Sequence, residues 1–300
     1  MDAQTRWIEL DGAVNVRDLG GLATTDGGTT RFGRVLRADN LQDLSPEDVQ
    51  RLTGDLALRD VIDLRSGPEV SLEGPGPLTR IPKVSIHHLS LFAEGGEYTD
   101  VEADVPPERT GPQQTGPQQT GPQETGPQEA GPQETDGQKI DIDKVLPWQE
   151  RRDEGPEADR SVGHYLGYLR ERPDSVVNAL RVMATSEGAA LVHCAAGKDR
   201  TGVVCALALE AVGVIREEVV ADYARTGERL EGILRRLRSS TTYAADLDSR
   251  PADSHLPHAY IMDKFLATLD ENHGGALGWL SSHGWTAADT RTLRARLTGS

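Results

Sequence analysis

The sequence predicts an α/β fold, with a central and mainly parallel sheet flanked by helices and with a helical C-terminal part. Two observations lead to this prediction. Short apolar runs, typical of buried strands, alternate with longer segments whose apolar residues recur at helical spacing. Strands that alternate with helices in this way favour a parallel sheet, because a parallel connection needs a long crossover segment.

The first half of the chain contains one predicted helix start and one predicted strand. Ser45 is suited to cap a helix, Pro46 to occupy its first position, and the two acidic residues that follow to favour its first turn. Residues 58–64 end in an apolar, β-branched run. This run predicts a strand in the middle of the sheet, buried on both faces.

The second half continues the alternation. Residues 175–184 carry apolar side chains at helical spacing, residues 189–192 form a short apolar run, and residues 203–214 are apolar on nearly every side. We therefore expect a helix, a buried strand and a buried helix, in that order. Pro257 and Gly274 bracket a further predicted helix, and a capping box at residues 286–289 predicts the last one.

One segment differs from the rest in composition. Residues 110–135 repeat Gly-Pro-Gln-Gln-Thr or close variants of it, without an apolar side chain to bury. The acidic residues around the repeat give residues 93–160 a net charge of −11, out of −16 for the whole chain. Without burial to offset the entropy of ordering, such a segment stays flexible. We expect a single domain over residues 1–300, with a flexible acidic insertion at 100–158.

Charge and cysteine content restrict the class of protein. A net charge of −16 argues against a nucleic-acid-binding face. The N-terminus lacks the pattern of a signal peptide, and no apolar run approaches the roughly 20 residues that span a bilayer. With only two cysteines, Cys194 and Cys205, disulfides do not organise the fold. We expect a cytoplasmic protein without an integral membrane segment.

The most informative segment is His-Cys-Ala-Ala-Gly-Lys-Asp-Arg-Thr-Gly at residues 193–202. It lies between a predicted buried strand and a predicted buried helix. Ligands of open α/β sheets bind beyond the carboxyl ends of the strands, and the N-terminus of a helix there attracts anions. A thiol in that setting, close to cations, ionises more readily and becomes a nucleophile. Cys194 is the candidate nucleophile.

The spacing of six residues between Cys194 and Arg200 allows the loop to curl around a phosphate. Arg200 then offers a planar fork to two of its oxygens. The hydroxyl of Thr201 can donate a hydrogen bond to the sulfur of Cys194 and ease its departure. The loop residues expected to bind the substrate are Ala195, Ala196, Gly197, Lys198, Thr201 and Gly202.

The pattern His-Cys-x5-Arg-Thr resembles the signature of the protein tyrosine phosphatases, and Lys198-Asp199 before the arginine is similar to the loop of an atypical bacterial family of them. This resemblance implies hydrolysis of phosphotyrosine, and also of phosphoserine, phosphothreonine or phosphoinositides, through a phosphocysteine. It implies no metal or cofactor. It also implies a helical lid, for which residues 216–238 are the candidate. The apolar underside of that lid would comprise Val219, Val220, Leu230, Ile233, Leu234 and Leu237.

Three further stretches resemble motifs of the same family. They are residues 15–21, which contain Arg17 and Asp18, residues 61–66, which contain Asp63 and Arg65, and the pair Asp222-Tyr223. Together with His193 they are expected to support the site. Each also has a structural alternative. Asp63 and Arg65 could form an ion pair that holds the edge of the sheet, and Asp222 could anchor a loop.

The general acid stays open between two aspartates. Asp199 lies in the loop itself, while Asp63 ends a strand that we expect to neighbour the loop. The position of Asp199 depends on fewer assumptions, so we favour it.

Three other functions are compatible with parts of this pattern. A phosphoinositide phosphatase would use the same loop, with Lys198 as a second cation for a strongly anionic substrate. An inactive phosphate-binding module would lack the nucleophile or the clamp, and an arsenate reductase would need a resolving thiol within reach. Cys205, inside a helix, is poorly placed for that role. The expected partner is therefore a phosphoprotein or a phosphoinositide.

Overall fold

The computed structural model describes residues 5–74, 76–93, 157–244, 247 and 255–299. The insertion predicted at residues 100–158 lies outside these residues, except that Glu157 and Ala158 begin a helix. The prediction of one domain that this insertion interrupts therefore stays a prediction.

Five strands form one sheet in the order β1-β2-β5-β3-β4. In chain order the strands are β1 (Arg17–Asp18), β2 (Val35–Ala38), β3 (Leu58–Asp63), β4 (Ser85–His88) and β5 (Ala189–His193). Only β1 pairs antiparallel, with β2, while the other neighbouring strands are parallel. The predicted α/β fold with a mainly parallel sheet is confirmed.

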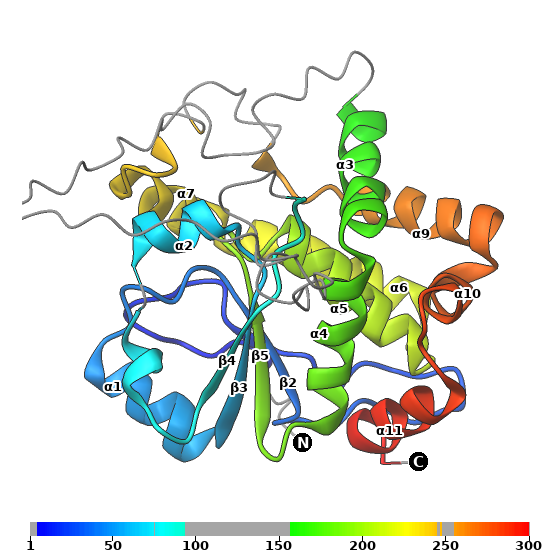
Figure 1. Cartoon of the computed structure of the whole chain (residues 1–300), viewed down its shortest axis with the longest axis horizontal. Helices are drawn as coiled ribbons and strands as arrows, with labels where there is room; N and C mark the ends of the chain where they lie inside the picture. Colours follow the sequence, from blue (N-terminus) through cyan, green and yellow to red (C-terminus); the bar gives the residue numbers. More distant parts are fainter. Residues whose placement is uncertain (1–4, 75, 94–156, 245–246, 248–254, 300) are drawn as a thin grey trace, which may run out of the picture.

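Helices connect and surround these strands (Figure 1). Those before β5 are α1 (Pro46–Gln50), a π-helical turn η1 (Arg51–Asp55), α2 (Gly67–Glu73), a 3-10 turn η2 (Pro77–Arg80), α3 (Glu157–Glu171) and α4 (Pro173–Thr185). Those after it are α5 (Asp199–Ala211), α6 (Arg216–Ala224), the 3-10 turn η5 (Arg225–Arg229), α7 (Leu230–Ser239), α9 (Ala259–His273), α10 (Gly275–Ser282) and α11 (Ala287–Leu297).

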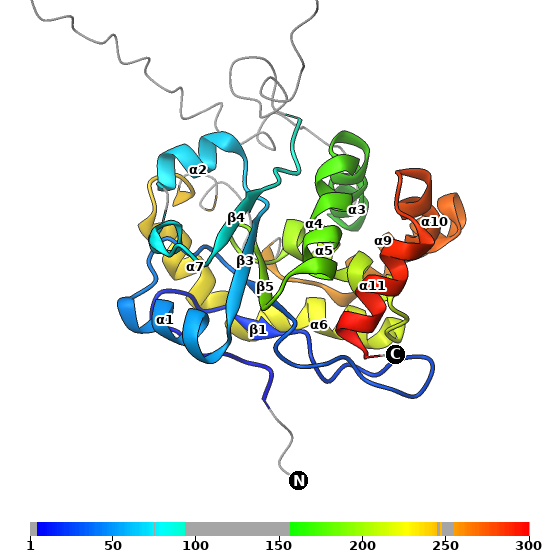
Figure 2. The ribbon, with the colours of Figure 1, turned by 60° about the horizontal axis from the view of Figure 1, so that its bottom comes forward.

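The two faces of the sheet bury different parts of the chain. Val192 in β5 and Ile62 in β3 point into a large core shared with α3, α4, α5 and the C-terminal helices. Their neighbours Leu191 and Val61 point to the other face, where α1, η1, η2 and the N-terminal segment cover them. Figure 2 shows this division, with α9, α10 and α11 on the α5 side of the sheet and α1 on the other. The central strands are therefore apolar on both faces, as their sequences predict.

Helix capping follows the sequence closely. The side chain of Ser45 accepts a hydrogen bond from the backbone of Asp48 at the start of α1, and Thr286 and Asp289 form the same capping box at α11. Gly274 ends α9 in the left-handed conformation, although this helix begins at Ala259, two residues after the predicted Pro257. Within the described residues, no helix is long and apolar enough to cross a membrane.

The carboxyl ends of the parallel strands meet at one edge of the sheet. β5 ends at His193 and leads into the loop before α5, while β3 ends at Asp63 and leads into α2. Figure 1 shows α2, α3 and α7 gathered at this edge. Here an open α/β sheet binds its ligands.

Candidate active site

The loop at residues 194–198 joins β5 to α5 at the bottom of a cavity of about 170 Å³. Cys194 lines this cavity but is only 2% exposed. Because α5 begins at Asp199, the N–H groups of its first turn have no partner within the helix, and its positive dipole end lies at the loop. The sequence pattern predicted this arrangement of strand, loop and helix. The loop is called the phosphate loop below.

Two helices form the walls of the cavity. On one side α3 contributes polar and aromatic side chains, and on the other α7 contributes an apolar row. The residues from α3 are Ser161, His164, Tyr165 and Tyr168, and those from α7 are Leu230, Ile233, Leu234 and Leu237. A substrate that enters therefore meets aromatic rings on one side, aliphatic side chains on the other and cations at the bottom.

Of the predicted lid at residues 216–238, only the second half lies at the cavity, and its action as a lid stays a prediction. Its second half, α7, packs on Ala195 and Ala196 of the phosphate loop. Its first half, α6, lies elsewhere, because Val219 and Val220 pack into the main core against α5 and α9. The sequence pattern differs between the two helices, because the apolar residues of α7 recur at helical spacing, whereas Val219 and Val220 of α6 are adjacent.

Arg200 is fixed by a carboxylate that the sequence analysis did not identify. Its guanidinium donates to both oxygens of Glu69, at 2.6 and 2.9 Å. Burial alone would lower the pKa of Arg200, but the adjacent Glu69 raises it well above its usual value. Burial alone would likewise raise the pKa of Glu69, but Arg200 holds it below the usual range. Both groups are therefore charged, and the fork has a fixed orientation.

Further donors hold Glu69 from α2 and from the segment after α7. The backbone N–H of Ser66 donates to it in a capping box, and the hydroxyl of Tyr243 donates at 3.1 Å. The capping box around Ser66-Gly67-Pro68-Glu69 was a signal for α2 in the sequence. Nothing in that local pattern indicated that the same carboxylate reaches Arg200, 131 residues away.

Asp63 lies beneath the phosphate loop, paired with Arg65. The guanidinium donates to both carboxylate oxygens, at 2.9 and 2.5 Å, and His193 lies 3.6 Å from one of them. Burial would raise the pKa of Asp63, but His193 and Arg65 hold it well below its usual range. A carboxyl group that stays ionised is a poor proton donor. The structural alternative for Asp63 and Arg65, an ion pair, is what the structure contains.

Asp199 lies at the cavity itself. Its side chain is 37% exposed, and one of its oxygens accepts a hydrogen bond of 2.5 Å from the hydroxyl of Tyr165. Lys198 lies beside it, 3.7 Å from the other oxygen, and donates to the backbone carbonyl of His255 at 3.0 Å. Of the two candidate acids, Asp199 lines the cavity, whereas Asp63 does not.

Gly197, Thr201 and Gly202, all predicted to bind the substrate, have different surroundings in the structure. Gly197 has a φ of +67°, and a Cβ there would collide with the backbone of Ala38 in β2. Gly202, predicted to bind substrate, instead lies against Tyr223, whose ring would be 2.8 Å from an added Cβ. Thr201 is fully buried, and its hydroxyl makes no hydrogen bond to any residue the structure describes. The predicted bond from this hydroxyl to the sulfur of Cys194 is therefore not formed in the structure.

The back of the phosphate loop is held by side chains from the N-terminal segment and β2. Asn15 donates to the carbonyl of Ala196 at 2.9 Å, and Arg37 donates to the carbonyl of Gly197 at 2.7 Å. Arg37 also pairs with Asp222 of α6 at 2.7 Å. Since Arg37 is buried, it places a fixed positive charge behind the loop. Its role was not predicted, because β2 itself was not.

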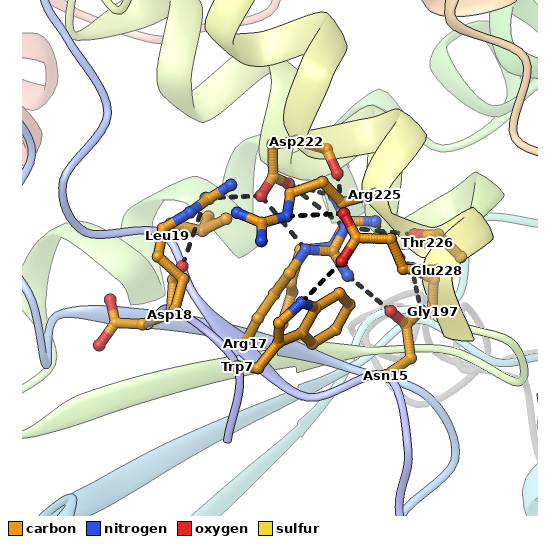
Figure 3. Close-up of polar contacts among 12 residues, drawn as sticks. Trp7, Asn15, Arg17, Asp18, Leu19, Gly197, Asp222, Arg225, Thr226 and Glu228 are labelled. Carbon is orange, nitrogen blue, oxygen red and sulfur yellow. Dashed lines mark hydrogen bonds and ion pairs between the residues drawn. The ribbon is translucent and has the colours of Figure 1, made fainter. Parts of the chain in front are cut away.

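Asp222 is the centre of this cluster, as Figure 3 shows. It pairs with Arg6, Arg17 and Arg37, three cations from separate parts of the N-terminal half. Burial and the like charge of Arg37 lower the pKa of Arg17 to about 10, although Asp222 opposes this change. Arg17 supports the phosphate loop indirectly, because it donates a hydrogen bond of 2.6 Å to Asn15, which in turn contacts the loop.

Asp18, also predicted to support the site, lies apart from the phosphate loop. Its two oxygens accept hydrogen bonds from the backbone of Gly20 and Gly33. It therefore orders the turn between β1 and β2. Cys205 is inside α5, where burial raises the pKa of its thiol to about 12, so it remains protonated and unreactive. No group of side chains among the described residues could hold a metal ion.

Comparison with known proteins agrees with this geometry. A sequence model described as the tyrosine phosphatase family matches residues 8–299. A triple specificity protein phosphatase, PtpB of Mycobacterium tuberculosis, is 30% identical over 97% of this chain and 99% of its own length. A tyrosine-protein phosphatase of Nostoc commune is 36% identical over 39% of this chain and 42% of its own. A putative tyrosine-protein phosphatase of Cupriavidus necator is 29% identical over 74% and 63%.

Proposed function

We propose that this chain, which belongs to the tyrosine phosphatase family, hydrolyses phosphotyrosine through a covalent phosphocysteine on Cys194. The observation that carries the proposal is the position of Cys194 and Arg200. Both line one cavity, at the N-terminus of α5 and at the carboxyl edge of a parallel sheet. A nucleophile, a planar and singly charged guanidinium that donates two hydrogen bonds, and backbone N–H groups at the start of a helix together suit a phosphoryl transfer.

The reaction has two steps. In the first, the thiolate of Cys194 attacks phosphorus, so that an S–P bond forms while the P–O bond to the substrate breaks. Asp199 gives its proton to the departing oxygen. In the second, water attacks phosphorus, the S–P bond breaks, and Asp199 takes up a proton from the water. Arg200, held in position by Glu69, stabilises the charge on the transferred phosphoryl group in both steps.

Asp199 is the proposed acid because it faces the cavity, while Asp63 is buried in its pair with Arg65. Asp63 and His193 are then positioning residues below the loop. Asn15, Arg17 and Arg37 hold the loop from behind.

The chain is a protein tyrosine phosphatase, and protein substrates are favoured over lipids, because the relatives are named as protein phosphatases. The name of the relative from Mycobacterium tuberculosis states triple specificity. We propose that phosphoserine and phosphothreonine are secondary substrates here, and that the phosphoinositide alternative is the weaker one. We also propose a cytoplasmic location, because Cys194 must stay reduced and both described cysteines are free thiols.

The test uses a phosphotyrosine peptide and p-nitrophenyl phosphate. We expect the wild-type protein to hydrolyse both and vanadate to inhibit it. Cys194→Ser should abolish turnover but still bind vanadate, because Arg200 and the loop backbone remain. Cys205→Ala is the matched control, since this buried thiol lies outside the cavity and should leave most of the activity. A dead Cys205→Ala together with an active Cys194→Ser would overturn the proposal.

A further inference from the structure

The hydroxyl of Tyr165 lies between a carboxylate and a second tyrosine. It donates to Oδ1 of Asp199 at 2.5 Å and lies 2.7 Å from the hydroxyl of Tyr223. The three residues come from different elements, since Tyr165 is in α3, Asp199 begins α5 and Tyr223 is in α6. The distance to Asp199 is in the range of a strong O–H···O⁻ hydrogen bond.

The direction of both bonds follows from the number of protons. A tyrosine hydroxyl has one proton, and Tyr165 gives it to the carboxylate of Asp199. The proton between the two tyrosines must then come from Tyr223. The bonds form a directed chain from Tyr223 to Tyr165 to Asp199, in which each donor strengthens the next.

We propose that Tyr165, supported by Tyr223, is a positioning residue that occupies Oδ1 of Asp199 and leaves Oδ2 as the oxygen that carries the catalytic proton. The proposal rests on the proposed function, in which Asp199 serves as general acid and then as base. With Oδ1 occupied as an acceptor in both steps, the same oxygen releases the proton to the departing alcohol and takes it back from water. No proton passes through Tyr165 itself.

The chain of hydroxyls is held rigidly enough for this role. The ring of Tyr165 stacks on Tyr168 and packs edge to face on Tyr223 and Phe265. Tyr223 lies directly against Gly202 of α5, so a side chain at that position would displace it. Both tyrosines are nearly completely buried, whereas Asp199 is partly exposed toward the cavity.

Tyr165 is also a donor at every pH at which such an enzyme works. Burial, followed by the charge of Asp199, raises the pKa of Tyr165 well above its usual value. The hydroxyl therefore remains protonated and keeps the proton that it donates to Asp199.

The test compares leaving groups in the full-length protein. Tyr165→Phe removes the hydroxyl and keeps the ring. We expect kcat/KM for phenyl phosphate, which reports the first step, to fall about tenfold, since a well-placed acid contributes roughly 10²–10⁴-fold and only its orientation is impaired. With p-nitrophenyl phosphate, whose leaving group needs little protonation, kcat/KM should change less than about twofold. Asp199→Asn should show the same selectivity, more strongly.

Tyr223→Phe is the matched control. It removes the other hydroxyl of the pair and keeps the bond from Tyr165 to Asp199, so its selective loss should be smaller, about threefold. If Tyr165→Phe does not fold in a thermal melt, Tyr223→Phe carries the test alone. An equal loss on both substrates, or no loss on phenyl phosphate, overturns the role of Tyr165. If the wild-type protein shows no hydrolysis that depends on Cys194, the proposed function is overturned, and this inference with it.

Discussion

The carboxylate of Glu69 accepts two hydrogen bonds from the guanidinium of Arg200 and is itself completely buried. The pair joins α2 to α5 across the cavity edge. Arg200 also donates to the backbone carbonyl of Leu64 at 3.3 Å, so the guanidinium has a fixed orientation before a substrate arrives. The proposed phosphate clamp is therefore oriented in advance, as in enzymes that stabilise a charged transition state with preorganised donors.

Glu69→Gln should hold the guanidinium of Arg200 less firmly in its orientation. Glutamine keeps one acceptor but loses the charge, so Arg200 keeps a hydrogen bond and loses its ionic partner. A charge-assisted bond contributes about 1.5–3 kcal/mol. We expect kcat/KM for a phosphotyrosine peptide to fall at least tenfold and vanadate to bind correspondingly more weakly. Steady-state kinetics and vanadate titration measure the two effects.

The control for this change is Glu47→Gln, because Glu47 is an exposed acid in the first turn of α1. Its kinetics should match the wild-type protein. Full activity of Glu69→Gln would mean that Arg200 keeps its orientation without the pair.

How much of this site the sequence could predict depends on how local each relationship is. The strand, loop and helix around Cys194 are contiguous, so apolar runs and loop residues were sufficient to place them. The capping box of Ser45 and Asp48 and that of Thr286 and Asp289 span four residues each, and both form.

The partners that complete the site are distant in sequence, and no local pattern connects them. Glu69 reaches Arg200 across 131 residues, and Arg37 reaches Gly197 across 160. Tyr165 follows the acidic insertion and meets Asp199 only because α3 packs beside α5. The prediction for α6 was wrong for the same reason, because an apolar helical face does not reveal which surface it covers.

Asp222→Asn should destabilise the whole protein. The variant leaves Arg6, Arg17 and Arg37 without their carboxylate, and breaking a buried ion pair costs about 3–5 kcal/mol. We expect a lower melting temperature, together with reduced activity, since Arg37 would hold the carbonyl of Gly197 less firmly. Vanadate added to the melt should restore less stability than in the wild-type protein. An unchanged melting temperature would contradict the central role of Asp222.

The buried His193 predicts how stability depends on pH. Burial lowers the pKa of His193 to about 4, although Asp63 opposes this change, while an unfolded histidine titrates near 6.5. Between these values the unfolded chain binds the additional proton, so stability is full above about pH 6.5 and falls as the pH drops toward 4. The loss should approach about 3 kcal/mol from this residue.

Urea unfolding at pH 7, 5.5 and 4.5 measures this dependence. His193→Gln cannot titrate, so its midpoint should change less over the same interval. Equal pH dependence in both proteins would show that other groups cause the decline. Asp63 adds little to this pH dependence above about pH 4, because it is ionised there both in the unfolded chain and in the folded protein, where its pKa is held well below the usual range.

The apolar wall from α7 should affect substrate binding more than chemistry. Leu234 lines the cavity and is half-buried, so Leu234→Ser removes an apolar contact for an aromatic ring and leaves the residues of the phosphate loop unchanged. We expect KM for a phosphotyrosine peptide to rise about threefold to tenfold, in line with the loss of roughly one apolar contact. Inhibition by inorganic phosphate should stay the same. The neighbouring Arg235→Ser, on the exposed side of α7, should leave both constants unchanged.

One comparison of two variants on two substrates shows whether Asp199 or Asp63 is the general acid. Asp199→Asn should reduce kcat/KM of phenyl phosphate roughly 10²-fold or more and that of p-nitrophenyl phosphate far less, because kcat/KM reports the first step and only the first leaving group needs a proton there. Asp63→Asn should lower both rates by a similar factor and reduce stability, because it breaks the buried pair with Arg65 and removes the partner of His193.

The reverse selectivity would assign the proton to Asp63. That result would require Asp63 to hold a proton beside Arg65 at 2.5 Å, which the charge of the guanidinium opposes. Asp63 would also have to become exposed, because a proton donor must come within hydrogen-bonding distance of the departing oxygen. Asp199 already lines the cavity.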